Sequence, residues 1–168
     1  MNTIDIKGDD QTFREIVSRT IDSFVDDTLT SVGNYAFYDC RSLTSVDLPA
    51  VTSIGASAFE NCAALTSVNI PVVTSVGNDS FSSCASLTSI ELQSVTFFGS
   101  MSLSYCLSLR KLIIRNTSGV ATLDAGNVFT NTNNVIIYVP DALVDSYKSA
   151  SRWSNYASRI KGLSDLPT

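Results

Sequence analysis

The four cysteines of the chain are the side chains whose type and spacing could do chemistry. They recur at a constant spacing, at Cys40, Cys62, Cys84 and Cys106. Such a set could form disulfides, bind a metal ion or supply a nucleophilic thiolate. A nucleophilic cysteine commonly uses a histidine as its base, and the sequence contains no histidine. The absence of histidine also removes the Ser-His-Asp triad and the His-based zinc motifs.

The equal spacing of the cysteines distinguishes the remaining interpretations. It would stack them in a straight column, one from each turn of a coiled chain. Neighbouring Cβ atoms in such a column lie about 4.8 Å apart, beyond the roughly 3.5–4.5 Å that disulfides use. A straight column also cannot surround a metal ion tetrahedrally. We therefore expect four buried, reduced thiols that pack as small apolar groups, with disulfides as the alternative and no metal or other cofactor.

Carboxylates are the other candidates for catalysis, and their spacing does not indicate a catalytic pair. The glycines recur with the period of the cysteines, which is a structural pattern and not that of a phosphate-binding loop. We therefore predict that the protein is not an enzyme. A hydrolase that uses two carboxylates is the third alternative for its function, after the two given below.

The segments that carry the cysteines repeat as a whole. Four segments begin at Thr30, Thr52, Thr74 and Thr96. When they are aligned, like residues fall into columns, of which the main ones are Gly33/Gly55/Gly77/Gly99, Ala36/Ala58/Ser80/Ser102, Phe37/Phe59/Phe81/Leu103, Leu43/Leu65/Leu87/Leu109, Val46/Val68/Ile90/Leu112 and Leu48/Ile70/Leu92/Ile114. The columns recur every 22 residues. A fixed period of this length predicts a solenoid in which each repeat forms one turn.

Each repeat contains the pattern Leu-x-x-Val-x-Leu, which predicts one short strand. Its last two apolar residues are two positions apart, so the residue between them points to the opposite side. Pro49 and Pro71 follow the first two strands and would end them, because proline has no N–H for the ladder. We expect the strands to form a parallel sheet, with the glycine column in a turn at positive φ.

The motif Ala-Phe-x-x-Cys-x-x-Leu-x-x-Val-x-Leu-Pro-x-Val-Thr-x-Ile-Gly resembles the repeat of the BspA-type leucine-rich repeat family of bacterial proteins. The resemblance covers residues 19–163, and the segment from Val135 to Leu163 looks like the closing segment of that family. It implies an α/β fold, a leucine-rich-repeat-like right-handed solenoid with one short parallel strand per 22-residue coil and helical N- and C-terminal caps. The family has no shared catalytic residues, and its repeats look like parts of bacterial surface, adhesion and prophage tail-associated proteins.

By its length the chain of 168 residues forms a single domain. We divide it into an N-terminal helix and first coil (1–29), four 22-residue repeats (30–115), an irregular last coil (116–140) and a helical C-terminal cap (141–168). A helix is expected at about residues 10–19. Two helices are expected in the cap, which should cover Leu109, Leu112 and Ile114. The first would start at Asp141 and carry Leu143, Val144 and Tyr147, and the second would start at Ser151, carry Trp153, Tyr156, Ala157 and Ile160, and end at Gly162.

The composition limits the partners. A net charge of −5 at pH 7 disfavours nucleic acid and anionic membrane surfaces. No apolar run is as long as the roughly 18 residues that a membrane span requires, so none is expected. The first residues do not read as a signal peptide. The cellular location therefore stays open, although the resemblance implies a surface, extracellular or virion-associated protein.

The polar side of the predicted strands is the candidate binding surface, since solenoids bind partners through extended faces. It comprises Ser45, Asp47, Ser67, Asn69, Ser89, Glu91 and Lys111. We expect a monomeric, non-catalytic recognition or adhesion module that binds a protein or a glycan there; a merely solvated face is the structural alternative. The functional alternative is a structural or assembly component of a phage tail or surface complex. The fourth repeat adds apolar residues that should meet the cap or form an exposed patch, namely Phe97, Met101, Tyr105 and Leu107.

Overall fold

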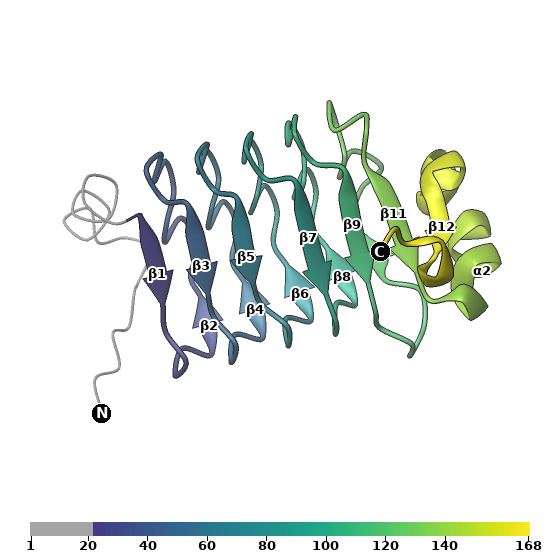
Figure 1. Ribbon diagram of the computed structural model, residues 1–168, viewed down its shortest axis with the longest axis horizontal. Coiled ribbons are helices and arrows are strands. Elements are labelled where there is room, and N and C mark those ends of the chain that lie inside the picture. The colour runs from purple at the N-terminus through teal and green to yellow at the C-terminus, as the bar shows by residue number, and fades with distance from the viewer. Residues whose placement is uncertain (1–21) are drawn as a thin grey trace.

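The computed structural model describes residues 22–168, which form a stack of coils closed at one end by a cap (Figure 1). The predicted N-terminal helix lies outside the described residues. Each coil contributes a strand to the polar face named above, which we call the strand face. These strands are β1 (Ser23–Val25), β3 (Ser45–Asp47), β5 (Ser67–Asn69), β7 (Ser89–Leu92), β9 (Lys111–Ile114) and β11 (Ile136–Val139).

A second strand in each coil was not predicted. These two-residue strands are β2 (Ser31–Val32), β4 (Ser53–Ile54), β6 (Ser75–Val76), β8 (Phe97–Phe98) and β10 (Thr122–Leu123). They pair in parallel and in register across the stack, for example Ser53 with Ser75. The solenoid of parallel strands is therefore confirmed, but the prediction of one strand per coil was wrong. A two-residue strand is too short to show an alternating pattern, and only its neighbours in the stack define it.

The core consists of the predicted columns. The rings of Phe37, Phe59 and Phe81 stack nearly parallel, with centroids 5.0 Å and 5.2 Å apart. The leucine and cysteine columns beside them are fully buried from Cys40 to Leu109. Offset stacking of this kind adds about 0.5–1.5 kcal/mol per pair beyond the area buried. The in-register repeat thus turns each sequence column into a continuous row of contacts.

The glycine column serves close approach and not positive φ. Among the described residues, positive φ occurs at only one glycine, Gly119, whereas the turns place non-glycine residues such as Ser57 and Asp79 there. A Cβ at Gly77 would lie 2.7 Å from the carbonyl carbon of Gly55 and 2.8 Å from the nitrogen of Ala56. The expectation of positive φ was therefore wrong. Glycine is required because the backbones of successive coils touch at this column.

Threonine hydroxyls join the coils beside the second sheet. Thr52, Thr74 and Thr96 each donate from Oγ1 to the carbonyl oxygen of the threonine one coil earlier, at 3.2, 3.2 and 3.1 Å. Their backbone N–H groups donate to the same carbonyl oxygens. The threonine of each regular coil therefore donates to a carbonyl oxygen of the preceding coil. Threonine is needed at the same position of every repeat for this reason.

The last coil is longer than the others. Phe97 pairs with Thr122 and Lys111 pairs with Ile136, so paired residues are further apart along the chain here than in the regular coils. The cap then comprises the 3-10 helix η1 (Asp141–Leu143), α2 (Val144–Ser149), the 3-10 helix η2 (Trp153–Arg159), β12 (Ile160–Gly162) and the 3-10 helix η3 (Leu163–Asp165).

Several details of the cap differ from the prediction. Asp141 does not cap a helix with its side chain; instead Asp141 Oδ1 accepts hydrogen bonds from the backbone N–H and the hydroxyl of Ser164. The second helix begins after Arg152, not at Ser151, and Ile160 belongs to β12, which pairs in parallel with β11. The apolar spacing of these residues fits a helix, but the open edge of β11 provides backbone partners that draw Ile160 into the sheet.

The cap covers the last coil and not the Leu109/Leu112/Ile114 layer. The indole of Trp153 packs edge-to-face against Tyr147 and contacts Phe98 and Phe129. Tyr105 and Leu107 stay 41% and 61% exposed. The preferred expectation that the extra apolar residues of the fourth repeat meet the cap was therefore wrong for these two, because residues 116–140 form a complete coil in between.

Candidate functional site

The strand face places the predicted polar residues in two parallel columns. On one side of a break, Ser45 lies opposite Ser67 and Asp47 opposite Asn69. On the other side, Ser89 lies opposite Lys111 and Glu91 opposite Ile113. Figure 1 shows β5 and β7 as neighbours on this face, but they belong to different sheets. The structure therefore brings the seven candidate residues together as two groups.

Hydrogen bonds hold the acidic residues of both groups. Asn69 Nδ2 donates to Asp47 Oδ1 at 2.7 Å. Arg115 Nε donates to Glu91 Oε1 at 2.5 Å in a half-exposed ion pair. Arg115 was not among the predicted site residues, although it replaces the proline of earlier repeats and could have been found on that basis. Exposed ion pairs add about 0–1 kcal/mol, so the effect is chiefly to fix the orientation of Glu91.

The polar face ends at β9 for a structural reason. Ile113 and Tyr138 continue the column of Asp47 and Glu91, yet they are only 8% and 5% exposed. The chain after β12 passes in front of β11 in the view of Figure 1, and η3 lies against β11. The accessible polar surface therefore extends no further toward the cap than the start of β9.

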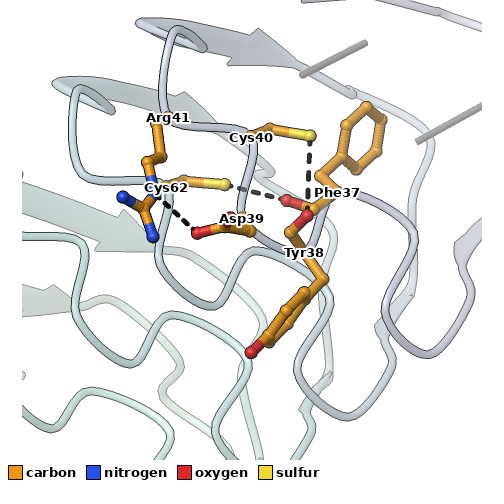
Figure 2. A network of polar contacts seen from close by, with 6 residues as sticks. All are labelled: Phe37, Tyr38, Asp39, Cys40, Arg41 and Cys62. Atoms are coloured by element: carbon orange, nitrogen blue, oxygen red, sulfur yellow. Dashed lines mark hydrogen bonds and ion pairs between the residues drawn. The ribbon is translucent and has the colours of Figure 1, made fainter. Parts of the chain in front are cut away.

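The cysteines form a buried column that is hydrogen-bonded to backbone, as Figure 2 shows for the first two. The Sγ atoms of Cys62, Cys84 and Cys106 donate to the carbonyl oxygens of Phe37, Phe59 and Phe81 at 3.1, 3.2 and 3.1 Å. Cys40 Sγ lies 4.0 Å from the carbonyl oxygen of Tyr38. The expected burial of all four thiols is confirmed.

The environment of the cysteines suppresses thiolate chemistry. Burial raises the pKa of Cys106 to about 12 and that of Cys84 well above its usual value. Two effects raise the pKa of Cys62: the larger is a hydrogen bond with Cys40, and the second is burial. Thiols with such pKa values stay protonated at neutral pH and are poor nucleophiles and poor metal ligands. Within residues 22–168, no group of three or more cysteine, aspartate, glutamate or histidine side chains could hold a metal ion.

The sequence of the chain matches a family model. Residues 9–148 match the BspA-type leucine-rich repeat region, in six copies. The chain belongs to the BspA-type leucine-rich repeat family. The proposed resemblance is thereby confirmed, and it makes the chain a repeat-based interaction module. No functionally curated protein is significantly similar to it.

Solved structures of bacterial proteins share the fold. A leucine-rich repeat protein of T. pallidum superposes with a TM-score of 0.63 and is 26% identical, over 72% of this chain and 60% of that one. A leucine-rich cell surface protein of Faecalibacterium prausnitzii gives 0.56 and 25%, over 75% and 41%. A leucine-rich repeat protein of Bacteroides ovatus gives 0.58 and 23%, over 85% and 36%, and shows the fold alone. The chain thus covers at most 60% of the length of these three proteins.

The described residues contain no helix that is both long and apolar enough to cross a membrane.

Proposed function

We propose that the chain is a non-catalytic recognition module that binds a protein or a glycan through the strand face. The observation that carries the proposal is the arrangement of Ser45, Asp47, Ser67, Asn69, Ser89, Glu91 and Lys111. They form in-register columns on two neighbouring sheets whose other side is core. Such a surface presents hydrogen-bonding groups on a rigid base and needs little reordering to bind.

The family and one neighbour support a place at the cell surface. The Faecalibacterium prausnitzii protein is described as a cell surface protein, and the chain shares its repeat architecture. Exposed hydroxyl groups of Ser67, Thr88 and Ser89 provide both donors and acceptors at this face. We therefore favour partners that the chain would meet outside the cell, such as surface glycans or proteins.

The proposal can be tested by changing one face at a time. A double variant with Ser67→Lys and Ser89→Lys alters the strand face, and a matched variant with Ser53→Lys and Ser75→Lys alters the second sheet. Binding of labelled protein to arrays of glycans and of purified surface proteins should be lost only in the first. Equal binding by the parent and both variants would show that the strand face is not the binding surface.

A second candidate function is an assembly component of a larger surface or virion complex. Tyr105 and Leu107 expose apolar surface on a turn where the first repeat carries Asp39 and Arg41. Tyr105 also adopts a positive φ of 55°, which is unfavourable for a bulky residue. If the chain is an assembly component, light scattering should detect self-association of the parent protein, and Leu107→Arg should abolish it. A parent protein that remains monomeric at high concentration would argue against it.

A further inference from the structure

The strand face contains one interruption, between β5 and β7. The backbone N–H of Thr66 donates to the carbonyl oxygen of Thr44 at 2.8 Å, and that of Arg110 donates to the carbonyl oxygen of Thr88 at 2.9 Å. Within the described residues, the corresponding bond from Thr88 to Thr66 is not formed. We call the line between residues 66–70 and residues 88–91 the seam.

The seam is confined to this face of the solenoid. Behind it, β4, β6 and β8 remain paired in one sheet. The rings of Phe59 and Phe81 stack at 5.2 Å, and the thiol of Cys84 donates to the carbonyl oxygen of Phe59. The two coils are therefore fixed to each other through the core and the second sheet, and the seam is a local opening and not a break between two domains.

The seam lies where the sequence of the strands changes. Pro71 follows β5, as Pro49 follows β3, and both strands have three residues. Gln93 and Arg115 replace proline after β7 and β9, and these strands have four residues. Because proline cannot donate to the ladder, Pro71 cannot make the bond that the N–H of Arg115 makes to the carbonyl oxygen of Leu92, and β3 and β5 are one residue shorter than β7 and β9. The seam is the junction between the two kinds of strand.

The surroundings of the seam are polar, with one apolar group beneath them. Val46 and Ile90 are 1% and 2% exposed, whereas Val68 in the same column is only half-buried. The polar residues around it are exposed, namely Thr66, Ser67, Asn69, Thr88 and Ser89. Unpaired backbone groups and exposed hydroxyl groups therefore meet along one line, and Val68 packs against the core on the inner side of it.

The width of the seam limits its occupant. A β-strand inserted here would require about 9.6 Å between the flanking strands, twice the ladder spacing. The Cα atoms of β5 and β7 approach within 8 Å, so a polypeptide strand does not fit between them. A hydroxyl group is much smaller than a strand, and it can donate to one strand and accept from the other at the same time.

We propose that the seam is a subsite for a neutral carbohydrate. Sugar hydroxyls accept from the N–H groups of Thr88 and Ser89 and donate to the carbonyl oxygen of Thr66. This inference rests on the proposed function of the strand face and names the ligand class.

The charges around the seam favour a neutral sugar over an anionic one. Neither of the bordering strands, β5 and β7, carries a basic side chain. Lys111 lies one strand further away, opposite Ser89, and Arg115 is paired with the carboxylate of Glu91. The seam itself therefore offers no cation for an anionic sugar, and Glu91 beside it would repel one.

The first experiment tests the seam in the protein without ligand. Amide hydrogen exchange should be faster at Thr88 and Ser89 than at the hydrogen-bonded Thr66, Ser67 and Arg110. Equal protection at all of these positions would mean that the ladder is closed, and would overturn the proposal.

The second experiment is titration of the isotope-labelled full chain with maltohexaose, chitohexaose and a serine-rich hexapeptide, followed by NMR. Either sugar should shift the amide signals of Ile70, Thr88 and Ser89 at millimolar concentration. Ser67→Lys places a long, charged side chain beside the seam and should weaken this binding about tenfold or more by obstructing the sugar. Ser45→Lys, in the same column but within an intact ladder, should leave it unchanged.

The outcomes separate this proposal from the broader one. Sugar-induced shifts elsewhere on the strand face, or binding of the peptide alone, would overturn the seam as a carbohydrate site and leave the recognition function standing. Absence of shifts with all three probes would also overturn it. The array experiment on the two double variants decides the recognition function independently.

Discussion

The regular coils and the last coil complete their hydrogen bonds by different means. In the regular coils the partner is the same residue one coil away, as with Thr52 and Thr74. Beyond the last coil there is no further repeat, and single side chains of the cap take its place. Trp153 donates to the carbonyl oxygen of Ala121, Tyr147 accepts from its N–H, Tyr156 donates to Gly126, and Arg152 and Arg159 donate to Leu123 and Thr132.

This difference shows which backbone groups a repeated sequence can pair by itself and which need a cap. Away from the seam, a position with like neighbours on both sides finds its hydrogen-bond partners in the adjacent coils, so a middle coil does not depend on a unique residue. An end coil has a neighbour on one side only. Its carbonyl and N–H groups therefore depend on aromatic and arginine side chains that occur once in the chain, and loss of these should be more damaging than loss of any one repeated residue.

Removal of the cap should have the largest effect. A chain truncated after Pro140 loses Tyr147, Trp153 and Tyr156 and exposes β11 as an open edge. Exposed strand edges with bare core promote aggregation, so the product should be insoluble or aggregated. Truncation after Asp165 is the control and should remain soluble. If the chain truncated after Pro140 stays monomeric with an unchanged melting temperature, the last coil does not depend on the cap for its stability.

Phe59→Ala should be next in size. The ring of Phe59 is stacked between Phe37 and Phe81 and is fully buried, so its removal should lower the free energy of unfolding by about 3–5 kcal/mol. Chemical denaturation measures the change, and Tyr35→Ala on the exposed turn is the control. A loss below about 1 kcal/mol would show that the stack does not carry the stability expected for a buried aromatic residue.

Gly77→Ala should destabilise the protein by about 1–3 kcal/mol, the usual range for overpacking. The added Cβ would meet the backbone of Gly55 and Ala56, which cannot move aside as a flexible side chain can. Gly126→Ala is the matched control, because its added Cβ would come no nearer than 3.4 Å to Asn155 Nδ2. Equal melting temperatures for the two variants would contradict the close-approach role of the glycine column.

The cysteine column should make stability fall at alkaline pH. Burial raises the pKa of Cys106 from 9.0 to about 12, so above pH 9.0 the unfolded chain releases this proton while the folded chain keeps it. Deprotonation therefore favours unfolding, and the stability is lost progressively between pH 9.0 and about 12. Denaturation midpoints measured across this range should fall less steeply in Cys106→Ser, which keeps a donor but does not ionise there. Identical slopes would mean that Cys106 titrates alike in both states.

The smallest effect is expected for Ser80→Ala. Ser80 Oγ is buried and has no hydrogen-bond partner within the described residues, and Ala36 and Ala58 occupy the same column. Removing this hydroxyl should leave stability unchanged or raise it by up to about 1 kcal/mol. Ser82→Ala is the contrast, since it would break the buried hydrogen bond to Ser104 and lower stability. A clear loss in Ser80→Ala would reveal a partner for its hydroxyl.

The sequence by itself determined the regular part of the molecule. A strict 22-residue period forces like residues to stack, so the strand register, the buried phenylalanine and cysteine columns and the polar columns of Asp47 and Ser45 could all be predicted. These features depend only on the spacing along the chain, and each is repeated often enough to be recognised above the variation of single residues.

The tertiary structure alone decided what depends on the distance between coils. The contact of Gly77 with Gly55, the two-residue strands of the second sheet, the transfer of Ile160 into β12 and the seam beside Val68 each arise from how two backbones approach one another. A column of residues indicates which positions stack but not how closely. The sequence of the cap occurs once, so it forms no column from which a position could be predicted. Only the open edge of β11 and the unpaired backbone groups of the last coil determine where Trp153 and Tyr147 bind.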